Sequence, residues 1–183
     1  MAHRMEEVTF ARDAEVILIP DGYPQVLPEG TRGWVTQVLG GNFTVQLETG
    51  RLVRLGADDA DAIGREAEVT TSTFDPEASI DEADVWDALR TCYDPEIPLN
   101  IVEIGLVYEV DLQPVEEGGV DVSVTMTLTA PGCGMGQVLA DDVQAKVEAI
   151  PAVRSGHVEL TFDPPWTPER MSEEGRLELG MFW

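Results

Sequence analysis

Residues 120–128 alternate strictly between apolar and polar side chains, and this run constrains the fold more than any other part of the chain. The apolar members of the run are Val120, Val122, Val124, Met126 and Leu128. A period of two places them on one face of a β-strand whose other face meets solvent. A helical apolar period follows over residues 139–150 and stops at Pro151. The chain therefore contains a half-buried strand that leads into an amphipathic helix.

The neighbouring segments extend this pair to an α-β-β-α-β-α order. Residues 106–112 are a strand candidate, and residues 116–119 supply the hairpin loop that joins it to the alternating strand. A last strand carries Val158, Leu160 and Phe162 on one face. Helices on one face of a small sheet are typical of an α+β domain, which is the fold class we predict for the second part of the chain.

Local signals predict where the two flanking helices begin. Ser79 and Glu82 have the spacing of a capping box, in which each side chain bonds a backbone N–H group. The apolar face of the helix that follows consists of Val85, Trp86, Leu89 and Cys92. Thr167 followed by Pro168 is a second start signal, and it predicts a final helix that runs toward Gly180.

The first part of the chain has a different pattern, of short apolar runs separated by glycine-rich turns. The strand candidates are residues 15–19, 33–39, 43–48 and 52–55. Such a series predicts a small all-β, barrel-like module, closed by a helical turn over residues 58–63. No group of residues with obvious chemistry lies here, so we interpret it as a binding or oligomerisation module.

A segment without clear periodicity separates the two parts. Residues 66–79 are rich in threonine, serine and acidic residues, a composition typical of a connecting loop. We therefore predict a β module at residues 1–68, a linker at residues 69–79 and an α+β domain at residues 80–183.

The charge balance excludes several classes of function. The chain has 35 acidic and 11 basic residues, a formal net charge of −24. A surface this negative repels phosphate backbones and anionic lipids, so we expect neither nucleic acid nor a membrane as a partner. No run approaches the roughly 20 apolar residues of a membrane span. Two isolated cysteines, Cys92 and Cys133, suit a reducing compartment, and we expect a cytoplasmic protein.

The loop at residues 129–136 is the strongest candidate for a functional site. Three glycines surround Cys133 there, so the backbone can adopt conformations closed to other residues and approach a ligand closely. The N-terminus of the following helix favours an anion, and a thiolate is both a nucleophile and a soft metal ligand. The alternative is a glycine-rich turn in which the cysteine is incidental. The glycine spacing does not match a phosphate-binding loop or a dinucleotide fingerprint.

Other residues allow competing interpretations. A Cys133–His157 pair would indicate a cysteine-dependent hydrolase or transferase, although the spacing does not require the two to meet. Asp94, Glu96 and Glu103 either form turns and caps or supply oxygen ligands beside the thiol, and the sequence does not decide between these roles. Cys92 shares an apolar helix face and is predicted to lie in the core.

Three segments resemble the metal–sulfur cluster assembly domain family, over about residues 78–183. They are DPEIPLNIVEIGLVYEV at residues 94–110, MTLTAPGCGMG at residues 126–136 and VELTFDPPWTPERMSEEGRLELG at residues 158–180. The resemblance implies an α+β domain and a part in the maturation of iron–sulfur proteins. The family's characteristic cysteine falls on Cys133. Glu103 stands where many relatives have aspartate. Gly175 replaces the usual alanine, a change that should weaken its helix by about 1 kcal/mol without touching the site.

From this resemblance we hypothesise a non-enzymatic factor that assembles iron–sulfur clusters or transfers them to client apoproteins. Cys133 would bind a transient iron or iron–sulfur species, and no tightly bound cofactor is expected. The residues around that species would be Asp94, Glu96, Thr129, Gly132 and Gly134. Expected partners are client apoproteins, a scaffold or a P-loop ATPase carrier, and a homodimer would bring two copies of Cys133 together. A metal-free adaptor that recruits clients through the β module is the remaining alternative.

Overall fold

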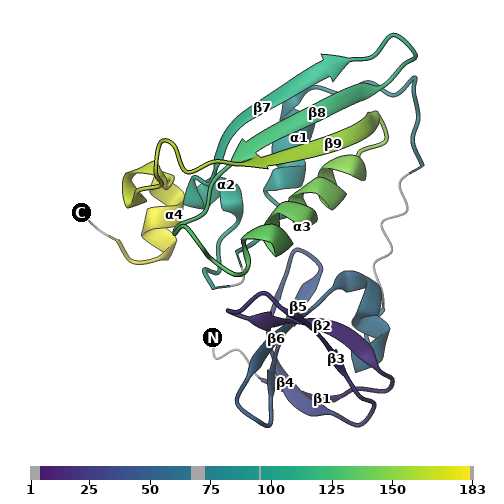
Figure 1. Cartoon of the computed structure of the whole chain (residues 1–183), viewed down its shortest axis with the longest axis vertical. Coiled ribbons are helices and arrows are strands. Elements are labelled where there is room, and N and C mark those ends of the chain that lie inside the picture. The colour runs from purple at the N-terminus through teal and green to yellow at the C-terminus, as the bar shows by residue number, and fades with distance from the viewer. Residues whose placement is uncertain (1–4, 67–72, 95, 182–183) are drawn as a thin grey trace. The chain divides into compact units, whose positions relative to one another are not determined.

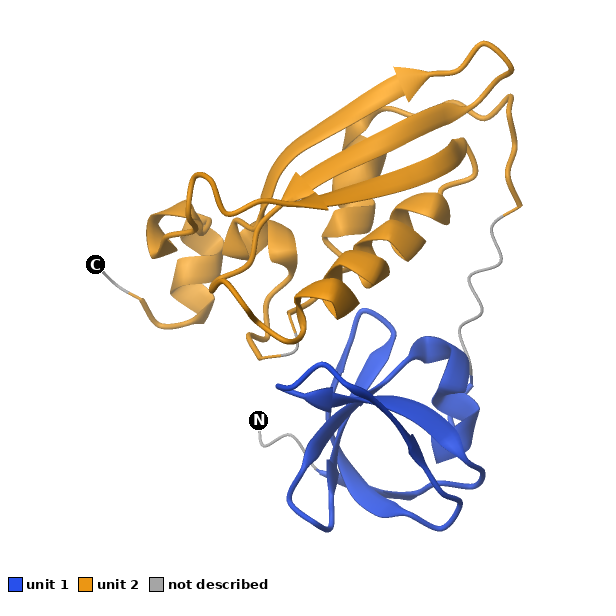
Figure 2. Ribbon diagram, in the orientation of Figure 1, with its two compact units in different colours: residues 1–70 blue, residues 71–183 orange. Residues whose placement is uncertain are grey.

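The chain divides into two compact units, residues 1–70 and residues 71–183 (Figure 2). The computed structural model describes residues 5–66, 73–94 and 96–181. Within the described residues, no helix combines the length and the apolar character needed to cross a lipid bilayer.

The first unit is built on a six-stranded antiparallel sheet (Figure 1). Its elements are β1 (Glu6–Thr9), β2 (Ala14–Ile19), β3 (Pro24–Leu27), β4 (Arg32–Leu39), β5 (Asn42–Leu47), β6 (Leu52–Leu55) and the 3-10 helix η1 (Ala57–Ile63). The strand order is β1-β4-β5-β6-β2-β3. Gly40 and Gly41 both have positive φ and form the turn between β4 and β5, a conformation that glycine adopts without steric cost.

Alternate residues of these strands form a core that is separate from that of the second unit. Its fully buried members include Phe10, Val16, Val45, Val53 and Leu55. The sequence predicts four of the six strands and misses β1 and β3. Both missed strands have only four residues and both lie at the edges of the sheet, so they carry little apolar pattern. The mixed α+β character predicted for the chain is confirmed, with a β-rich first unit.

The second unit consists of a three-stranded sheet with helices packed on one face (Figure 1). Its elements are α1 (Glu82–Leu89), α2 (Ile101–Ile104), β7 (Val107–Pro114), β8 (Val120–Met126), α3 (Gly136–Glu148), β9 (Val153–Leu160), the 3-10 helix η2 (Pro168–Arg170) and α4 (Glu173–Glu178). The central strand β8 pairs antiparallel with β7 and parallel with β9. A parallel pair needs a crossover, and α3 provides it.

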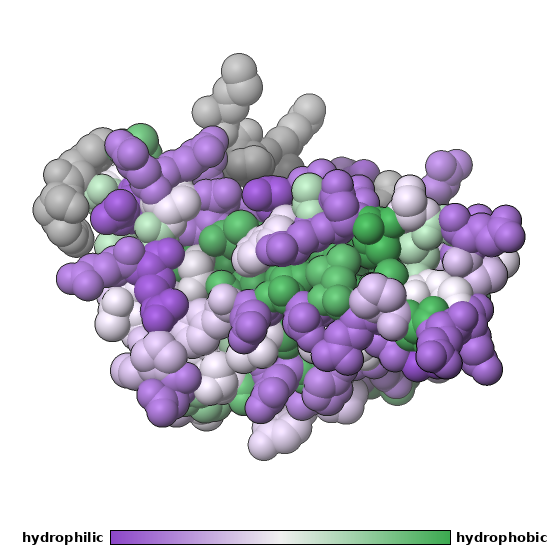
Figure 3. Space-filling view, turned by 90° about the horizontal axis from the view of Figure 1, so that it is seen from above, coloured by the Kyte–Doolittle hydropathy of each residue, from purple (hydrophilic) through white to green (hydrophobic). Residues whose placement is uncertain are grey.

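The core of this unit lies between β8 and the two longer helices. Val122, Val124 and Met126 are at most 1% exposed, as the alternating run predicts. They share one cluster with Val85 and Leu89 of α1 and with the buried face of α3, which consists of Leu139, Val143 and Val147. Several apolar residues at the rim of this cluster are only partly buried, and Figure 3 shows an apolar area on the surface of the molecule.

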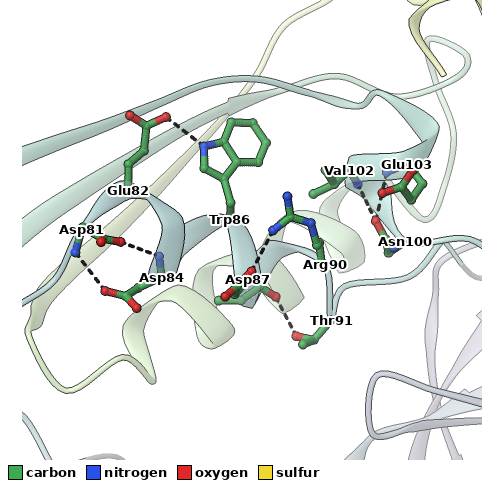
Figure 4. A network of polar contacts seen from close by, with 11 residues as sticks. Asp81, Glu82, Asp84, Trp86, Asp87, Arg90, Thr91, Asn100, Val102 and Glu103 are labelled. Carbon is green, nitrogen blue, oxygen red and sulfur yellow. Dashed lines mark hydrogen bonds and ion pairs between the residues drawn. The ribbon is translucent and has the colours of Figure 1, made fainter. Parts of the chain in front are cut away.

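The first helix does not begin at the predicted capping box. The N-cap is Asp81, whose carboxylate accepts from the Asp84 N–H at 3.1 Å, while the Asp84 carboxylate accepts from the Asp81 N–H at 2.9 Å (Figure 4). The prediction that Ser79 and Glu82 form this box was wrong, because an aspartate pair makes the same reciprocal bonds two residues later. Glu82 instead accepts from the Trp86 indole N–H at 2.9 Å.

Two predictions near the C-terminus also need correction. Pro168 begins only the short η2, and α4 starts separately behind Ser172, whose hydroxyl accepts from the Gly175 N–H at 2.9 Å. The last strand ends at Leu160, and Phe162 is 41% exposed rather than part of its buried face. The reason is that the chain leaves the sheet at the Asp163-Pro164-Pro165 segment, where prolines cannot continue a ladder.

Candidate functional site

A short loop carries the chain from the end of β8 to the start of α3. Its beginning is anchored by Thr127, which is fully buried and donates its N–H to the Leu106 carbonyl at 2.8 Å. Its end is equally tight, because a methyl group added at Gly136 would lie 2.4 Å from a terminal carbon of Leu128. Glycine at this position therefore lets the first turn of α3 press against the end of the strand.

Cys133 lies in the middle of this loop, three residues before the first residue of α3. Its side chain is half-buried and packs at the rim of the core, whereas Gly132 and Gly134 on either side are exposed. The Cys133 carbonyl accepts from the Gly136 N–H at 3.0 Å. Gly132 has φ +81, a left-handed conformation that L side chains rarely adopt. The loop thus presents one thiol at the surface beside the start of a helix.

Cys92 has the opposite environment. It is 0% exposed at the end of α1, and its sulfur lies 3.8 Å from the Ala88 carbonyl oxygen. The prediction that Cys92 belongs to the core is confirmed.

Asp94 holds a loop of its own. One carboxylate oxygen accepts from the backbone N–H groups of Glu96 at 2.8 Å and Ile97 at 3.0 Å. This is the turn-forming geometry expected of aspartate in such a position. Glu96 is exposed, and Ile97 and Cys133 both pack against the same core cluster. Among the described residues, no hydrogen bond or ion pair links Cys133 to Asp94 or Glu96.

Glu103 binds Ser172 and not the cysteine loop. Its carboxylate accepts from the Ser172 hydroxyl, and its carbonyl accepts from the Ser172 N–H at 2.9 Å. Asn100 caps the helix that carries it, with the amide oxygen accepting from the Val102 and Glu103 N–H groups (Figure 4). Glu103 therefore ties α2 to α4. Over the described parts of the chain, no three His, Cys, Asp or Glu side chains are grouped so that they could hold a metal ion.

The same junction changes the interpretation of Gly175. A methyl group added there would lie 2.9 Å from the Glu103 carbonyl oxygen. The glycine is therefore required for α4 to pack this closely on α2, and it does more than lower helix propensity.

His157 lies away from the Cys133 loop. Its neighbour Gly156 faces α3, because an added methyl there would lie 3.0 Å from the Glu148 Cγ and 3.5 Å from a Val147 methyl. Successive strand residues point to opposite faces, so His157 is exposed on the face that the helices leave open. Cys133 stands at the start of α3 on the other face. The structure does not bring the two together, and a Cys133–His157 dyad is not formed.

The resolved shifts of pKa in this unit lie on that open face. Arg154 donates to both carboxylate oxygens of Asp121, at 2.9 and 2.6 Å, and the Ser155 hydroxyl donates to the same group at 2.9 Å. The guanidinium chiefly, and then the hydroxyl, lower the pKa of Asp121, while desolvation opposes them. These charges stabilise the strand pair β8–β9 and are distant in the fold from the cysteine loop.

Comparison with known proteins connects this loop to a family. The family described as "Iron-sulfur cluster assembly protein" matches residues 82–160. A "Fe-S protein maturation auxiliary factor" of Porphyromonas gingivalis is 48% identical over 101 residues, which cover 54% of this chain and 90% of that protein. The chain belongs to the iron–sulfur cluster assembly protein family.

Two further members of the family are similar. The "Fe-S protein maturation auxiliary factor YitW" of Bacillus subtilis is 36% identical over 97 residues, covering 53% of this chain and 91% of that protein. The "Fe-S protein maturation auxiliary factor SufT" of Staphylococcus aureus is 40% identical over 88 residues, covering 48% and 96%. The predicted resemblance to the metal–sulfur cluster assembly domain family is confirmed, and SufT is among the similar proteins.

The match to the family runs from α1 to β9 and includes the Asp94 turn, Glu103 and the Cys133 loop. Thr129 is half-buried at the entrance of that loop. The six-stranded sheet of the first unit lies outside the matched residues. The family is thus established by the second unit alone.

Sequence reasoning missed the contacts that fix the C-terminal segment on this matched region. The Trp166 indole N–H donates to the Ile104 carbonyl at 2.9 Å, and the Tyr108 hydroxyl donates to the Pro164 carbonyl at 2.8 Å. The Arg170 guanidinium carbon lies 4.1 Å from the centre of the Tyr108 ring. Only the anchoring role of Trp166 was predictable, from a large aromatic residue beside two prolines.

Proposed function

We propose that this chain is an accessory factor that assembles iron–sulfur clusters or transfers them to client proteins, and that it acts through Cys133 rather than as an enzyme. The observation that carries the proposal is the placement of Cys133. Its thiol is half-buried in an exposed glycine loop at the start of α3, within the residues that match the family. The relatives named as maturation auxiliary factors support the accessory role.

The chemistry of the loop suits a transient ligand. A thiolate is a soft donor for iron and for iron–sulfur clusters, and the start of a helix favours the negative charge of the bound species. One protein thiolate leaves most coordination positions of a cluster open, so a second chain, a client cysteine or a small thiol must complete the set. A homodimer would supply two copies of Cys133. A weak, incomplete site is what a handover requires.

The neighbouring residues have positioning roles in this proposal. Asp94 holds the backbone of Glu96 and Ile97, and Glu96 offers an exposed carboxylate beside it. Gly132 and Gly134 keep the approach to the sulfur open, and Thr129 sets the entrance of the loop. None of these side chains is required to be a permanent ligand.

The organisation of the chain follows from the same proposal. Residues 80–183 would act as the cluster assembly domain, residues 69–79 as a linker and residues 1–68 as a module that recruits partners. Those partners would be client apoproteins and the assembly machinery, including a scaffold or a P-loop ATPase carrier. The location we propose is the cytoplasm, where thiols stay reduced.

The test is anaerobic reconstitution with ferrous iron and sulfide, followed by transfer to an apo-ferredoxin. Wild type and the variants Cys133→Ser, Cys92→Ser and His157→Ala are compared for bound iron, acid-labile sulfide and the rate at which the ferredoxin gains its cluster absorbance. Loss of both binding and transfer only in Cys133→Ser supports the proposal. Equal transfer by wild type and Cys133→Ser contradicts it and favours the metal-free adaptor. A comparable loss in His157→Ala would favour the hydrolase or transferase alternative.

A further inference from the structure

The strand β7 is the edge of the three-stranded sheet, and the helices cover its inward face incompletely. Val110 and Leu112 lie opposite Val124 and Val122 of β8, so they point toward the same core. Yet the two β8 residues are 1% exposed, whereas Val107, Val110 and Leu112 are only partly buried at the rim of the cluster. The difference comes from the strand's position at the edge, since all five residues share one face.

The lengths of the elements explain this exposure. The helix α1, which packs beside β7, has eight residues and spans about 12 Å, whereas the eight residues of β7 span about 27 Å. One short helix therefore covers about half of the strand. Trp86 of α1 and Ile80 are also only partly buried against the same cluster. Seen from above, from the side on which β7 lies in Figure 1, the molecule shows a continuous apolar area bordered by hydrophilic residues (Figure 3).

At the opposite edge of the sheet, which β9 forms, a side chain binds one backbone group. The Gly156 N–H of β9 donates to the Glu148 carboxylate at 3.1 Å, and α3 packs along that strand. In the described part of the chain, no backbone hydrogen bond joins residues 109–113 to any element except β8. An edge with unpaired backbone groups beside apolar side chains is a template for an additional strand.

The charges on β7 select the occupant of that edge. Glu109 and Asp111 are exposed on the open face of the sheet, opposite Thr125 and Ser123. Pairing two copies of this edge would bring four carboxylates close together, and like charges across a strand pair are destabilising. A strand with lysine or arginine at these positions gains attraction instead. The acidic edge therefore opposes a second copy of this chain and favours a basic partner segment.

We propose that β7 and the apolar strip of Val110, Leu112 and Trp86 bind an extended segment of a partner protein in which basic and apolar residues alternate. The segment adds a fourth strand to the sheet. Its apolar side chains cover the strip, and its basic side chains face Glu109 and Asp111. This surface is separate from the Cys133 loop, so the proposal goes beyond the proposed function and stands without it.

The test uses a fluorescein-labelled nine-residue peptide in which lysine alternates with valine, measured by fluorescence anisotropy at about 0.15 M salt, where the Debye length is about 8 Å. Two further peptides carry N-methyl groups on all lysine amides or on all valine amides. In a strand, one of these sets points toward β7 and the other points away. Strand addition predicts that one methylated peptide loses at least ten-fold in affinity and that the other binds as the parent does.

Protein variants test the role of charge. Glu109→Lys together with Asp111→Lys should weaken the lysine–valine peptide at least ten-fold and should bind a glutamate–valine peptide instead. The matched control is Glu159→Lys together with Glu169→Lys, an equal change of charge at exposed positions outside β7, and it should keep most of the affinity. Cys133→Ser should bind as wild type, which separates this proposal from the cluster-transfer role.

Several results would overturn the inference. Equal binding of the two methylated peptides indicates unspecific attraction to an acidic protein, and so does an equal loss in both charge-reversed proteins. No binding of the parent peptide also contradicts it. Light scattering that reports a dimer which the peptide dissociates would assign the edge to a second copy of the chain instead.

Discussion

The end of α1 and the start of α3 each carry one cysteine, and the fold gives the two thiols opposite properties. Cys92 follows the last turn of α1 and is fully enclosed, with its sulfur directed to the Ala88 carbonyl. Cys133 precedes α3 in a loop whose glycines are exposed, and its side chain is half-buried. The two residues are of the same type, so the solvent accessibility of the thiol and its position at the start or the end of a helix decide which cysteine can react or bind a metal.

The largest expected difference between the two thiols is in their reactivity. Iodoacetamide added to the native protein should alkylate Cys133 at least about 100-fold faster than Cys92, because Cys92 reacts only when the fold opens. Mass spectrometry of tryptic peptides over time measures both rates. Comparable rates would show that the environments are not different in solution, and denaturant should abolish the difference.

The next effect separates function from folding. Cys133→Ser should lower cluster transfer at least ten-fold and change the free energy of unfolding by no more than about 0.5 kcal/mol, because the half-buried side chain lies at the rim of the core and not inside it. Urea unfolding followed by circular dichroism provides the stability, and the ferredoxin assay provides the transfer rate. A large loss of stability would mean that Cys133 acts as a core residue after all.

Cys92→Ser should show the converse. Burying a serine hydroxyl costs about 1–3 kcal/mol when it lacks a hydrogen bond and less when it donates to the Ala88 carbonyl, which the thiol of Cys92 faces. The midpoint in urea should therefore fall, while the transfer rate of the folded protein stays near wild type. The control is Cys92→Ala, which leaves a small cavity and no polar group. If fully folded Cys92→Ser lost cluster transfer, Cys92 would have a role beyond the core and the contrast between the two cysteines would be wrong.

A smaller effect is expected from the backbone beside Cys133. Gly132→Ala forces an L side chain into the left-handed region at φ +81 and should cost about 1 kcal/mol, while Gly132→Asn should cost less because asparagine tolerates this conformation. An added methyl meets no neighbour within 4 Å, so the cost is conformational and not steric. Thermal unfolding of the two variants measures it, and equal values would contradict this explanation.

The smallest expected effect is on the pH dependence of the stability, and it involves neither cysteine. The pKa of Asp121 is lowered by Arg154, so the ion pair contributes stability above the ordinary aspartate pKa, and this contribution is lost as pH falls through the lowered value. Asp121→Asn should flatten the dependence of stability on pH at about pH 4 and below. Unfolding midpoints between pH 2 and 7 measure the slope. An unchanged slope would show that the pair is screened by solvent.

Periodicity predicted the parts of the fold that depend on one buried face. The run at residues 120–128 and the helix after it were predictable because apolar side chains repeat at a fixed spacing over enough residues. The beginnings of helices were less predictable. Ser79 and Asp81 are both acceptable caps by residue type, and the structure uses Asp81.

The site was predictable only in part, for a related physical reason. The placement of Cys133 follows from a local pattern of strand, glycine turn and helix, all within about twenty residues. The role of Glu103 does not, because its partner Ser172 lies 69 residues away and no local pattern connects them. The failure of the Cys133–His157 pair has the same origin, since strand parity places His157 on the opposite face.

The contacts of the C-terminal segment determine how the part of the protein that matches the family can be isolated. The stretch that matches the family stops at residue 160, but Met171 is only 4% exposed and Trp166 packs on the same core. A fragment trimmed to residues 82–160 would expose apolar surface beside Ile104, which is fully buried and whose carbonyl binds Trp166 in the whole chain. Recombinant proteins that extend through Met181 should stay monodisperse, whereas fragments that end at residue 160 should aggregate during purification.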